Sequence, residues 1–113
     1  MVEPTRKEIL KLKEMLTAED EWMRKNAAWV FGNNPGHAKE ALPSLLKALD
    51  DEDVYVRLWS VQALGELGPD AASALEKLER MAKEDPYDGQ FMMIKFPVRH
   101  MAKEAIVRIK RKS

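Results

Sequence analysis

The stretch LPSLLKALDDEDVYVRLWSVQALGELGP, residues 42–69, decides how this chain folds. It contains two apolar runs with the i, i+3, i+4, i+7 spacing of a helix that buries one face. An acidic segment at 50–53 separates the runs, and Gly68-Pro69 ends the second one. Two helices joined by so few residues form an antiparallel hairpin, which cannot shield its apolar faces from water alone. This hairpin therefore needs neighbours.

The same pattern occurs earlier in the chain at a fixed offset of 33 residues. The pairs at this offset lie in both predicted helices: Ile9 and Leu42, Leu12 and Leu45, Leu16 and Leu49, Met23 and Val56, Arg24 and Arg57, and Phe31 and Leu64. One offset that spans two helices and their turn is the mark of an internal repeat. The spacing predicts a first hairpin with helices at about 5–17 and 20–32, ended by the helix-breaking residues 33–36.

A third copy follows, interrupted by an insertion. Leu75 and Leu78 continue the 33-residue spacing, whereas Val98-Arg99 match Val56-Arg57 at an offset of 42, which leaves nine extra residues (42 minus 33) near 86–95. The predicted fold is all-α, an α-solenoid of three helical hairpins in one domain over residues 1–113. The predicted repeats are about 5–36, 37–69 and 70–111.

The composition fits a folded domain and argues against several functional classes. Of the 113 residues, 45% are hydrophobic and 34% charged, and the 19 basic and 19 acidic residues give a net charge of zero. We therefore expect no general affinity for nucleic acid or membranes. The chain has no cysteine, which fits a reducing cytoplasm. We expect no membrane segment, because no apolar run is long enough and MVEPTRKEIL lacks a signal-peptide core.

The segment LLKALDDEDVYVRLWSVQALGELG, residues 45–68, resembles a HEAT repeat, in particular the short variety known from phycobilin lyases. The shared pattern is an apolar helix, an acidic turn, Val-Arg, small residues and then Ala-Leu-Gly. The resemblance covers nearly the whole chain. Ankyrin repeats have a similar period, but their Thr-Pro-Leu-His signature is absent.

The resemblance implies a ladder of charged residues that stacks the hairpins in register. The arginines at the matching positions are Arg24, Arg57 and Arg99, and the acidic matches are Asp51 and Glu84. Ala18 occupies the acidic position in the first repeat, so Glu19 or Asp20 would have to substitute for it. We interpret these residues as structural.

The resemblance also implies that the second helix of each hairpin lines an inner, concave face. The outward positions of the first two second helices form the predicted partner-binding set: Trp22, Lys25, Trp29, Tyr55, Leu58, Trp59 and Gln62. Exposed aromatic side chains are favoured contacts for a partner protein or peptide. The alternative is that these bulky groups lean into the core between repeats.

The insertion contributes a second candidate contact. Phe91, Met92, Met93 and Ile94 form an apolar run, of which Phe91 and Met92 join the predicted partner-binding set. One interpretation is that the run folds over the open end of the solenoid as a cap. The other is that it forms a methionine-rich, adaptable contact for a partner or for self-association.

Catalytic, cofactor and metal sites find little support. His100 and Glu104 share a helix face, and His37 and Glu40 lie near another helix start. HEAT-like deoxyhypusine hydroxylases hold iron with His-Glu dipeptides, but the matching position here reads Arg99-His100-Met101. We therefore predict no metal, no cofactor and no enzymatic activity.

The sequence thus predicts a non-enzymatic protein-protein interaction module or scaffold. The alternative is a nucleic-acid-binding repeat protein that uses its basic carboxy-terminal helix, with Arg108, Lys110, Arg111 and Lys112. Strong salt dependence of binding would favour that alternative. Self-association also stays open, because a short stack of repeats leaves its ends uncovered.

Overall fold

The fold consists of helices and one small β-hairpin, as seen in a computed structural model that describes residues 4–111. The elements in chain order are α1 (Arg6–Met15), α2 (Glu21–Asn33), α3 (Pro35–Ala38), the 3₁₀ segment η1 (Lys39–Ala41), α4 (Leu42–Ala48), α5 (Val54–Leu67), the 3₁₀ segment η2 (Gly68–Ala74), α6 (Leu75–Glu84), β1 (Gln90–Phe91), β2 (Ile94–Lys95) and α7 (Pro97–Lys110). The predicted all-α helical-repeat fold is confirmed.

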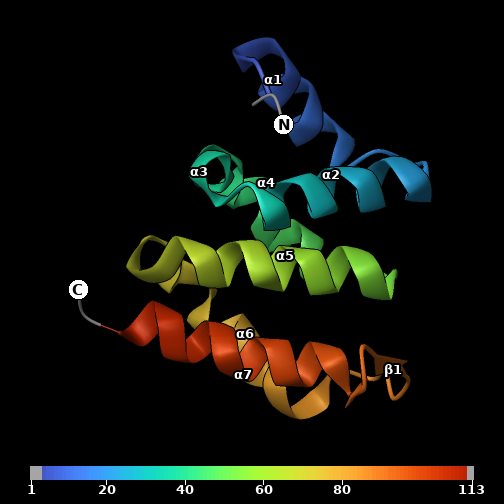
Figure 1. The fold of residues 1–113 in the computed structure, drawn as a ribbon, viewed down its shortest axis with the longest axis vertical. Helices are drawn as coiled ribbons and strands as arrows, with labels where there is room; N and C mark the ends of the chain where they lie inside the picture. The colour runs from blue at the N-terminus through green and yellow to red at the C-terminus, as the bar shows by residue number, and fades with distance from the viewer. Residues whose placement is uncertain (1–3, 112–113) are drawn as a thin grey trace.

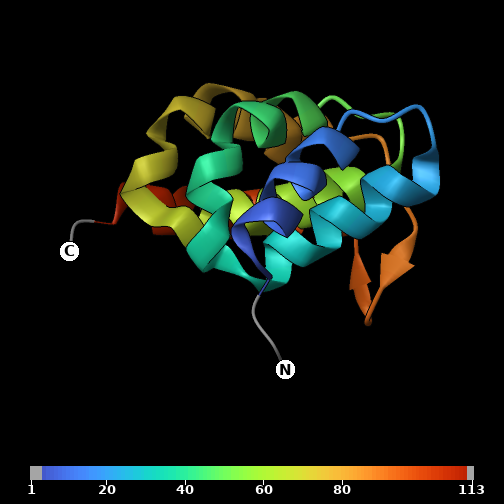
Figure 2. The same ribbon diagram turned by 90° about the horizontal axis from the view of Figure 1, so that it is seen from above.

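The second helix of each hairpin lies in one layer. Helices α2, α5 and α7 run side by side, and α4 and α6 lie behind them (Figures 1 and 2). Helix α5 contacts α2 on one side and α7 on the other, while α1 contacts α2. The middle helix is therefore surrounded far more completely than the outer two.

Side-chain caps set where the second helices begin. Asp20 and Asp53, which are 33 residues apart, accept hydrogen bonds from the backbone N–H of Trp22 (2.8 Å) and Val56 (3.0 Å). A carboxylate at this position satisfies backbone donors that have no partner within the helix. The repeat therefore includes the start signal of its second helix as well as the apolar pattern.

The first helix begins with a capping box. Thr5 accepts a hydrogen bond from the backbone N–H of Glu8, and the Glu8 carboxylate accepts one from the backbone N–H of Thr5. The backbone hydrogen bond from Thr5 holds the pKa of Glu8 below its ordinary value.

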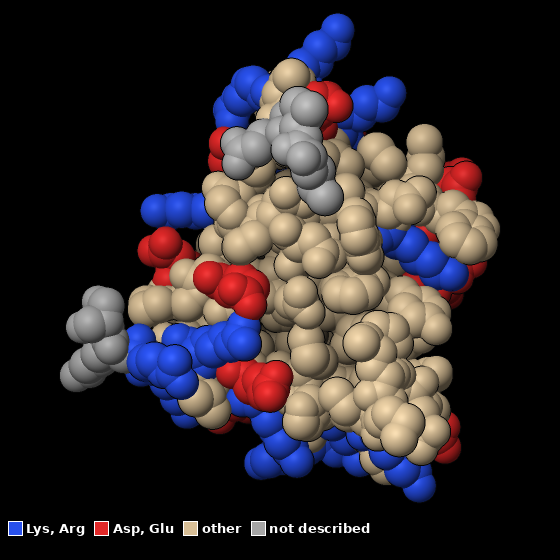
Figure 3. Space-filling view, in the orientation of Figure 1, with Lys and Arg blue, Asp and Glu red and all other residues tan. Residues whose placement is uncertain are grey.

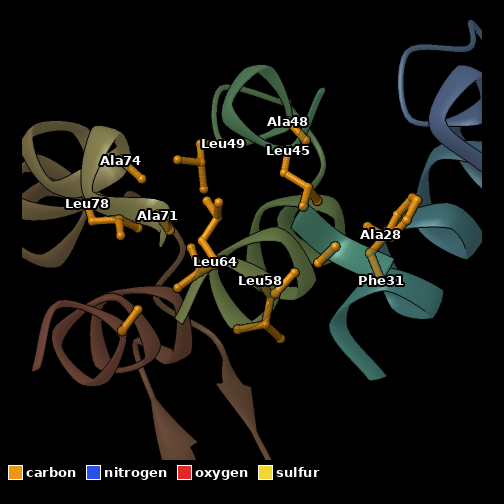
Figure 4. Close-up of a cluster of buried hydrophobic side chains, with 14 of the residues drawn as sticks. Ala28, Phe31, Leu45, Ala48, Leu49, Leu58, Leu64, Ala71, Ala74 and Leu78 are labelled. Carbon is orange, nitrogen blue, oxygen red and sulfur yellow. The ribbon is translucent and has the colours of Figure 1, made fainter. Parts of the chain in front are cut away.

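The core runs continuously between the two layers. Its largest side chains come from matching positions of the repeats, such as Phe31 with Leu64 and Leu45 with Leu78, all fully buried. Figure 4 shows how these residues interleave between adjacent helices. Each hairpin thus buries its apolar face against the next one.

Glycines let adjacent second helices approach closely. A Cβ on Gly65 of α5 would lie 3.0 Å from the Cβ of Ala105 and 3.1 Å from its Cα on α7. A Cβ on Gly32 of α2 would lie 3.1 Å from the carbonyl oxygen of Trp59 on α5. The glycine of the repeated Phe-Gly and Leu-Gly pairs therefore has a packing role.

The ladder of charges connects each hairpin to the next. Arg24 donates from Nε to Asp51 (2.7 Å) of the following hairpin, and Arg57 donates from Nε to Asp85 (2.8 Å). The hydrogen bond to Asp51 raises the pKa of Arg24. The prediction that Glu84 is the acidic partner in the third repeat is wrong. Glu84 is exposed on the last turn of α6, and Asp85 follows with an extended backbone that brings its buried carboxylate to Arg57.

The first repeat needs no acidic residue at Ala18. The Arg24 guanidinium donates instead to the backbone carbonyl oxygens of Ala18 (2.9 Å) and Glu19 (2.8 Å). Arg57 makes the same pair of bonds to the carbonyl oxygens of Asp51 and Glu52. Each arginine therefore also closes the turn that precedes its own helix.

Replacing Ser60 with alanine is expected to leave the protein as stable or to stabilise it by up to about 1 kcal/mol. Ser60 is fully buried in α5, and its hydroxyl has no hydrogen-bond partner among residues 4–111. Alanine occupies the matching positions 27 and 102. Urea denaturation of the wild-type protein and the Ser60→Ala variant measures the difference, and a loss above about 1 kcal/mol would show a hidden hydroxyl contact.

Candidate partner-binding surface

The layer of α2, α5 and α7 presents one broad face to solvent. Figure 3, in the orientation of Figure 1, shows that uncharged residues cover most of the centre of this face and that charged residues gather towards its margins. A surface with that distribution suits a protein contact better than a polyanion.

Three aromatic side chains of this face are exposed. Trp22 of α2 has 68% of its surface accessible, and Trp29 of α2 and Tyr55 of α5 are also exposed. The alternative that these rings are core residues is therefore wrong for all three. We call these residues, together with the half-buried Trp59 and Phe91, the aromatic face.

Lys25 contacts two of these rings. Its ammonium group lies 4.7 Å from the ring centroid of Trp22 and 5.6 Å from that of Tyr55. It also lies 3.4 Å from carboxylate oxygens of Glu21 and Asp53. Desolvation alone would lower the pKa of Lys25, but the carboxylates of Asp53 and Glu21 raise it above its ordinary value. Lys25 therefore stays charged while it contacts the two rings.

Trp59 and Gln62 connect the face to the helices beneath it. Trp59 packs partly against the core, and its backbone passes close to Gly32 of α2. Gln62 donates from Nε2 to the carbonyl oxygen of Gly32 (3.1 Å). The interpretation of Trp59 as a residue that leans into the space between repeats is thus supported, and Gln62 already has a structural partner.

The prediction that Leu58 faces outward is wrong. Leu58 has only 1% of its surface accessible and belongs to the buried core. Its counterparts, Lys25 of α2 and His100 of α7, are more exposed, and α5 is the helix that has another second helix on each side. Leu58 is therefore removed from the candidate surface.

The insertion forms a hairpin that extends the aromatic face. Strands β1 and β2 pair antiparallel, with Phe91 opposite Ile94. The Phe91 ring meets the Tyr55 ring edge-on at 6.4 Å and the Trp59 ring at 6.0 Å. Phe91 thus packs on α5, whereas Met92 at the tip has 79% of its surface accessible. Because Phe91 lies against rings of the middle helix, its contacts favour the interpretation of this run as part of a contact surface over that of a cap.

Met93 is missing from the predicted binding set, although it is the most exposed large apolar residue of the described chain, at 94%. The sequence signal is its central place in the run Phe91-Met92-Met93-Ile94. When the outer residues of such a four-residue run pair as strands, the two middle residues form the turn.

The histidines do not gather with other metal ligands. His100 Nε2 lies 3.5 Å from an oxygen of Glu104, and both side chains are about half exposed. Within residues 4–111, no three His, Cys, Asp or Glu side chains come together around a position that an ion could occupy. In that same range no helix is both long and apolar enough to cross a membrane.

The basic end of α7 is partly neutralised by the repeat before it. Arg108 forms an ion pair with Glu66 of α5, and Lys110 and Arg111 are exposed. Lys112 lies outside the described residues. This arrangement is typical of cations that favour a helix carboxy terminus.

Comparison with protein families gives a match to HEAT repeats over residues 9–90. The matched segment covers the first two hairpins, α6 and the beginning of the insertion. A comparison with curated proteins finds no match.

Proposed function

Because the chain belongs to the HEAT-repeat family, we propose that it is a non-enzymatic protein-binding module whose contact surface is the aromatic face. HEAT repeats commonly mediate contacts between proteins. The chain would act by burying apolar groups of a partner against α2, α5 and the hairpin. Charged residues at the margin would set the orientation of the partner.

The observation that carries this proposal is the exposure of Trp22, Trp29 and Tyr55 on one face. Exposed aromatic residues that cluster on a folded surface are unusual and are enriched among residues that dominate binding energy. Lys25 contacts two of the three rings, and such cation–π contacts favour an ordered position for each ring. Such order lowers the entropy that binding must overcome.

The finer assignments rest on the sequence. The Val-Arg and Leu-Gly pairs favour the short repeat type of the phycobilin lyases, but bilin-lyase activity would follow from the repeat name alone and is not proposed. The lack of cysteine favours a reducing compartment such as the cytoplasm.

A displayed library of random helical peptides tests this function while the natural partner is unidentified. The library is selected on the immobilised wild-type protein, and the enriched peptides are then measured against variants. Trp22→Ala and Trp29→Ala are each expected to weaken binding by about tenfold or more. Both should change the free energy of unfolding by less than about 1 kcal/mol, because the side chains are exposed.

Leu10→Ala is the matched control for the selected peptides. Leu10 is an exposed apolar residue on α1, outside the layer of second helices. The Leu10→Ala variant should bind the selected peptides as tightly as the wild-type protein does. If the enriched peptides bind both tryptophan variants as tightly as the wild-type protein, the proposed surface is wrong.

A further inference from the structure

The tip of the hairpin is built in a strained conformation. Met92 and Met93 have φ angles of 47° and 72°, in the left-handed region that residues other than glycine rarely adopt. Positive φ at both central residues of a two-residue hairpin loop is the geometry of a type I′ turn, which favours Asn-Gly. Methionine supplies neither the conformational freedom of glycine nor the local hydrogen bonding of asparagine. The tip thus combines an unfavourable turn with two nearly fully exposed apolar side chains.

The hairpin is attached to the aromatic face and projects beyond it. Phe91 packs edge-on against Tyr55 and Trp59, and the backbone N–H of Phe96 donates to the carbonyl oxygen of Gly89 (3.3 Å). Figure 2 shows the two strands extending away from the layer of second helices. The methionine tip therefore stands beside the exposed rings, where a partner seated on the face would meet it.

One margin of the same face is acidic. Glu21, Glu52, Asp53 and Asp88 line an open depression of about 580 Å³ that also includes Tyr87, and we call these four carboxylates the acidic edge. Arg57 reaches this depression, but its guanidinium is bound to Asp85. Lys25 contacts two members of the edge, Glu21 and Asp53, and also the rings of Trp22 and Tyr55. The acidic edge is therefore continuous with the aromatic face.

Cations offset only part of this charge, since Lys25 lies 3.4 Å from oxygens of Glu21 and Asp53, and Arg24 Nη2 lies 3.9 Å from Glu52. Lys95 and Arg99 lie 5.8 Å and 4.5 Å from the ring of Phe96. Arg99 also donates from Nε to the carbonyl oxygen of Asp85. The side chain of Glu52, by contrast, is 93% exposed. A cationic group of a partner would find the exposed carboxylates of Glu52 and Asp88 here.

We propose that the partner is a basic amphipathic helix, with its apolar side held between the aromatic face and the Met92–Met93 tip and its cationic residues on the acidic edge. This inference rests on the proposed function and specifies the class of partner. Exposed methionines adapt to apolar side chains of varied shape, and an amphipathic helix presents such side chains as a stripe. An anionic membrane surface would be repelled by the acidic edge.

Two synthetic peptides provide the test. They share a leucine stripe at helical spacing, and their polar side consists of lysine in one and glutamate in the other. Fluorescence anisotropy of the labelled peptides is measured against the full chain at low and at physiological salt. The lysine peptide is expected to bind at least about tenfold more tightly than the glutamate peptide, and its affinity should fall as salt rises.

A turn-optimised variant tests the role of the tip. Met92→Asn combined with Met93→Gly gives the residues that a type I′ turn favours, so it is expected to raise the melting temperature. The same variant should bind the lysine peptide about tenfold more weakly, because both apolar tip residues are lost. Binding that decreases while stability increases cannot result from misfolding.

The outcomes separate this inference from the proposed function. If the turn variant binds like the wild-type protein while Trp29→Ala still weakens binding, the tip has no role but the aromatic face stands. If the lysine peptide binds and Trp29→Ala does not change its affinity, the aromatic face is not the binding surface. The proposed function and this inference then both fail. Equal binding of the two peptides, or no binding of the lysine peptide, overturns the basic partner. A wild-type dimer that the turn variant dissociates, or binding to anionic vesicles, would also overturn it.

Discussion

Replacing Arg57 with alanine is expected to lower the free energy of unfolding by about 3–5 kcal/mol. The Arg57 and Asp85 side chains are almost completely buried and make two hydrogen bonds, from Nε (2.8 Å) and from Nη2 (3.2 Å). Truncation leaves the Asp85 carboxylate buried without its countercharge. It also removes the two bonds that Arg57 makes to the backbone of the preceding turn.

Urea denaturation measures this loss, with Arg6→Ala as the control. Arg6 pairs with Glu40 on the exposed surface, where an ion pair contributes only about 0–1 kcal/mol. The double variant Arg57→Ala/Asp85→Ala should lose less than the sum of the two single variants, because no unpaired charge is then buried. A loss below about 1 kcal/mol for Arg57→Ala would show that the hairpins stack without the ladder.

Leu58→Ala is expected to destabilise the protein by about 2–5 kcal/mol, because it leaves a cavity in the core. Leu58 lies inside the cluster that α5 forms with its neighbours (Figure 4). If Leu58 faced outward, as the repeat predicts, Leu58→Ala would change the free energy of unfolding by no more than about 0.5 kcal/mol. Val107→Ala on α7, where the valine is exposed, provides the matched helical control. Equal losses for the two variants would place Leu58 at the surface.

The repeat pattern predicts those features that depend on neighbours along the chain. The spacing places Ile9, Leu45 and Phe31 on apolar faces, and all three are buried. It also predicts helices at about 5–17 and 20–32, and α1 and α2 span Arg6–Met15 and Glu21–Asn33. Such features follow from helix periodicity and from the breaker residues between helices.

The errors arise where burial depends on neighbours in space. Lys25, Leu58 and His100 share one repeat position, yet only Leu58 sits on a helix with another second helix on each side. Periodicity within one helix cannot show how many helices surround it. Asp85 replaces Glu84 in the ladder because the chain leaves α6 at that residue, a change of one position that the repeat offset could not show.

The repeat pattern does not predict the hairpin tip either. The four-residue apolar run at 91–94 leaves open whether the segment caps the stack or contacts a partner. In the structure Phe91 pairs with Ile94 across the hairpin, and this pairing leaves the two methionines at the tip. A turn without Asn or Gly gives little sequence signal for a hairpin.

The central claim, that the aromatic face binds a partner protein, is tested most directly by the indole N–H signals of the three tryptophans in an NMR titration. The titrant is a peptide enriched on the wild-type protein from the displayed library. The account predicts that the signals of Trp22 and Trp29 shift with the peptide and saturate at one equivalent. If the peptide binds and all three indole signals stay in place while amides of α4 and α6 shift, the partner occupies the opposite side and the account is contradicted.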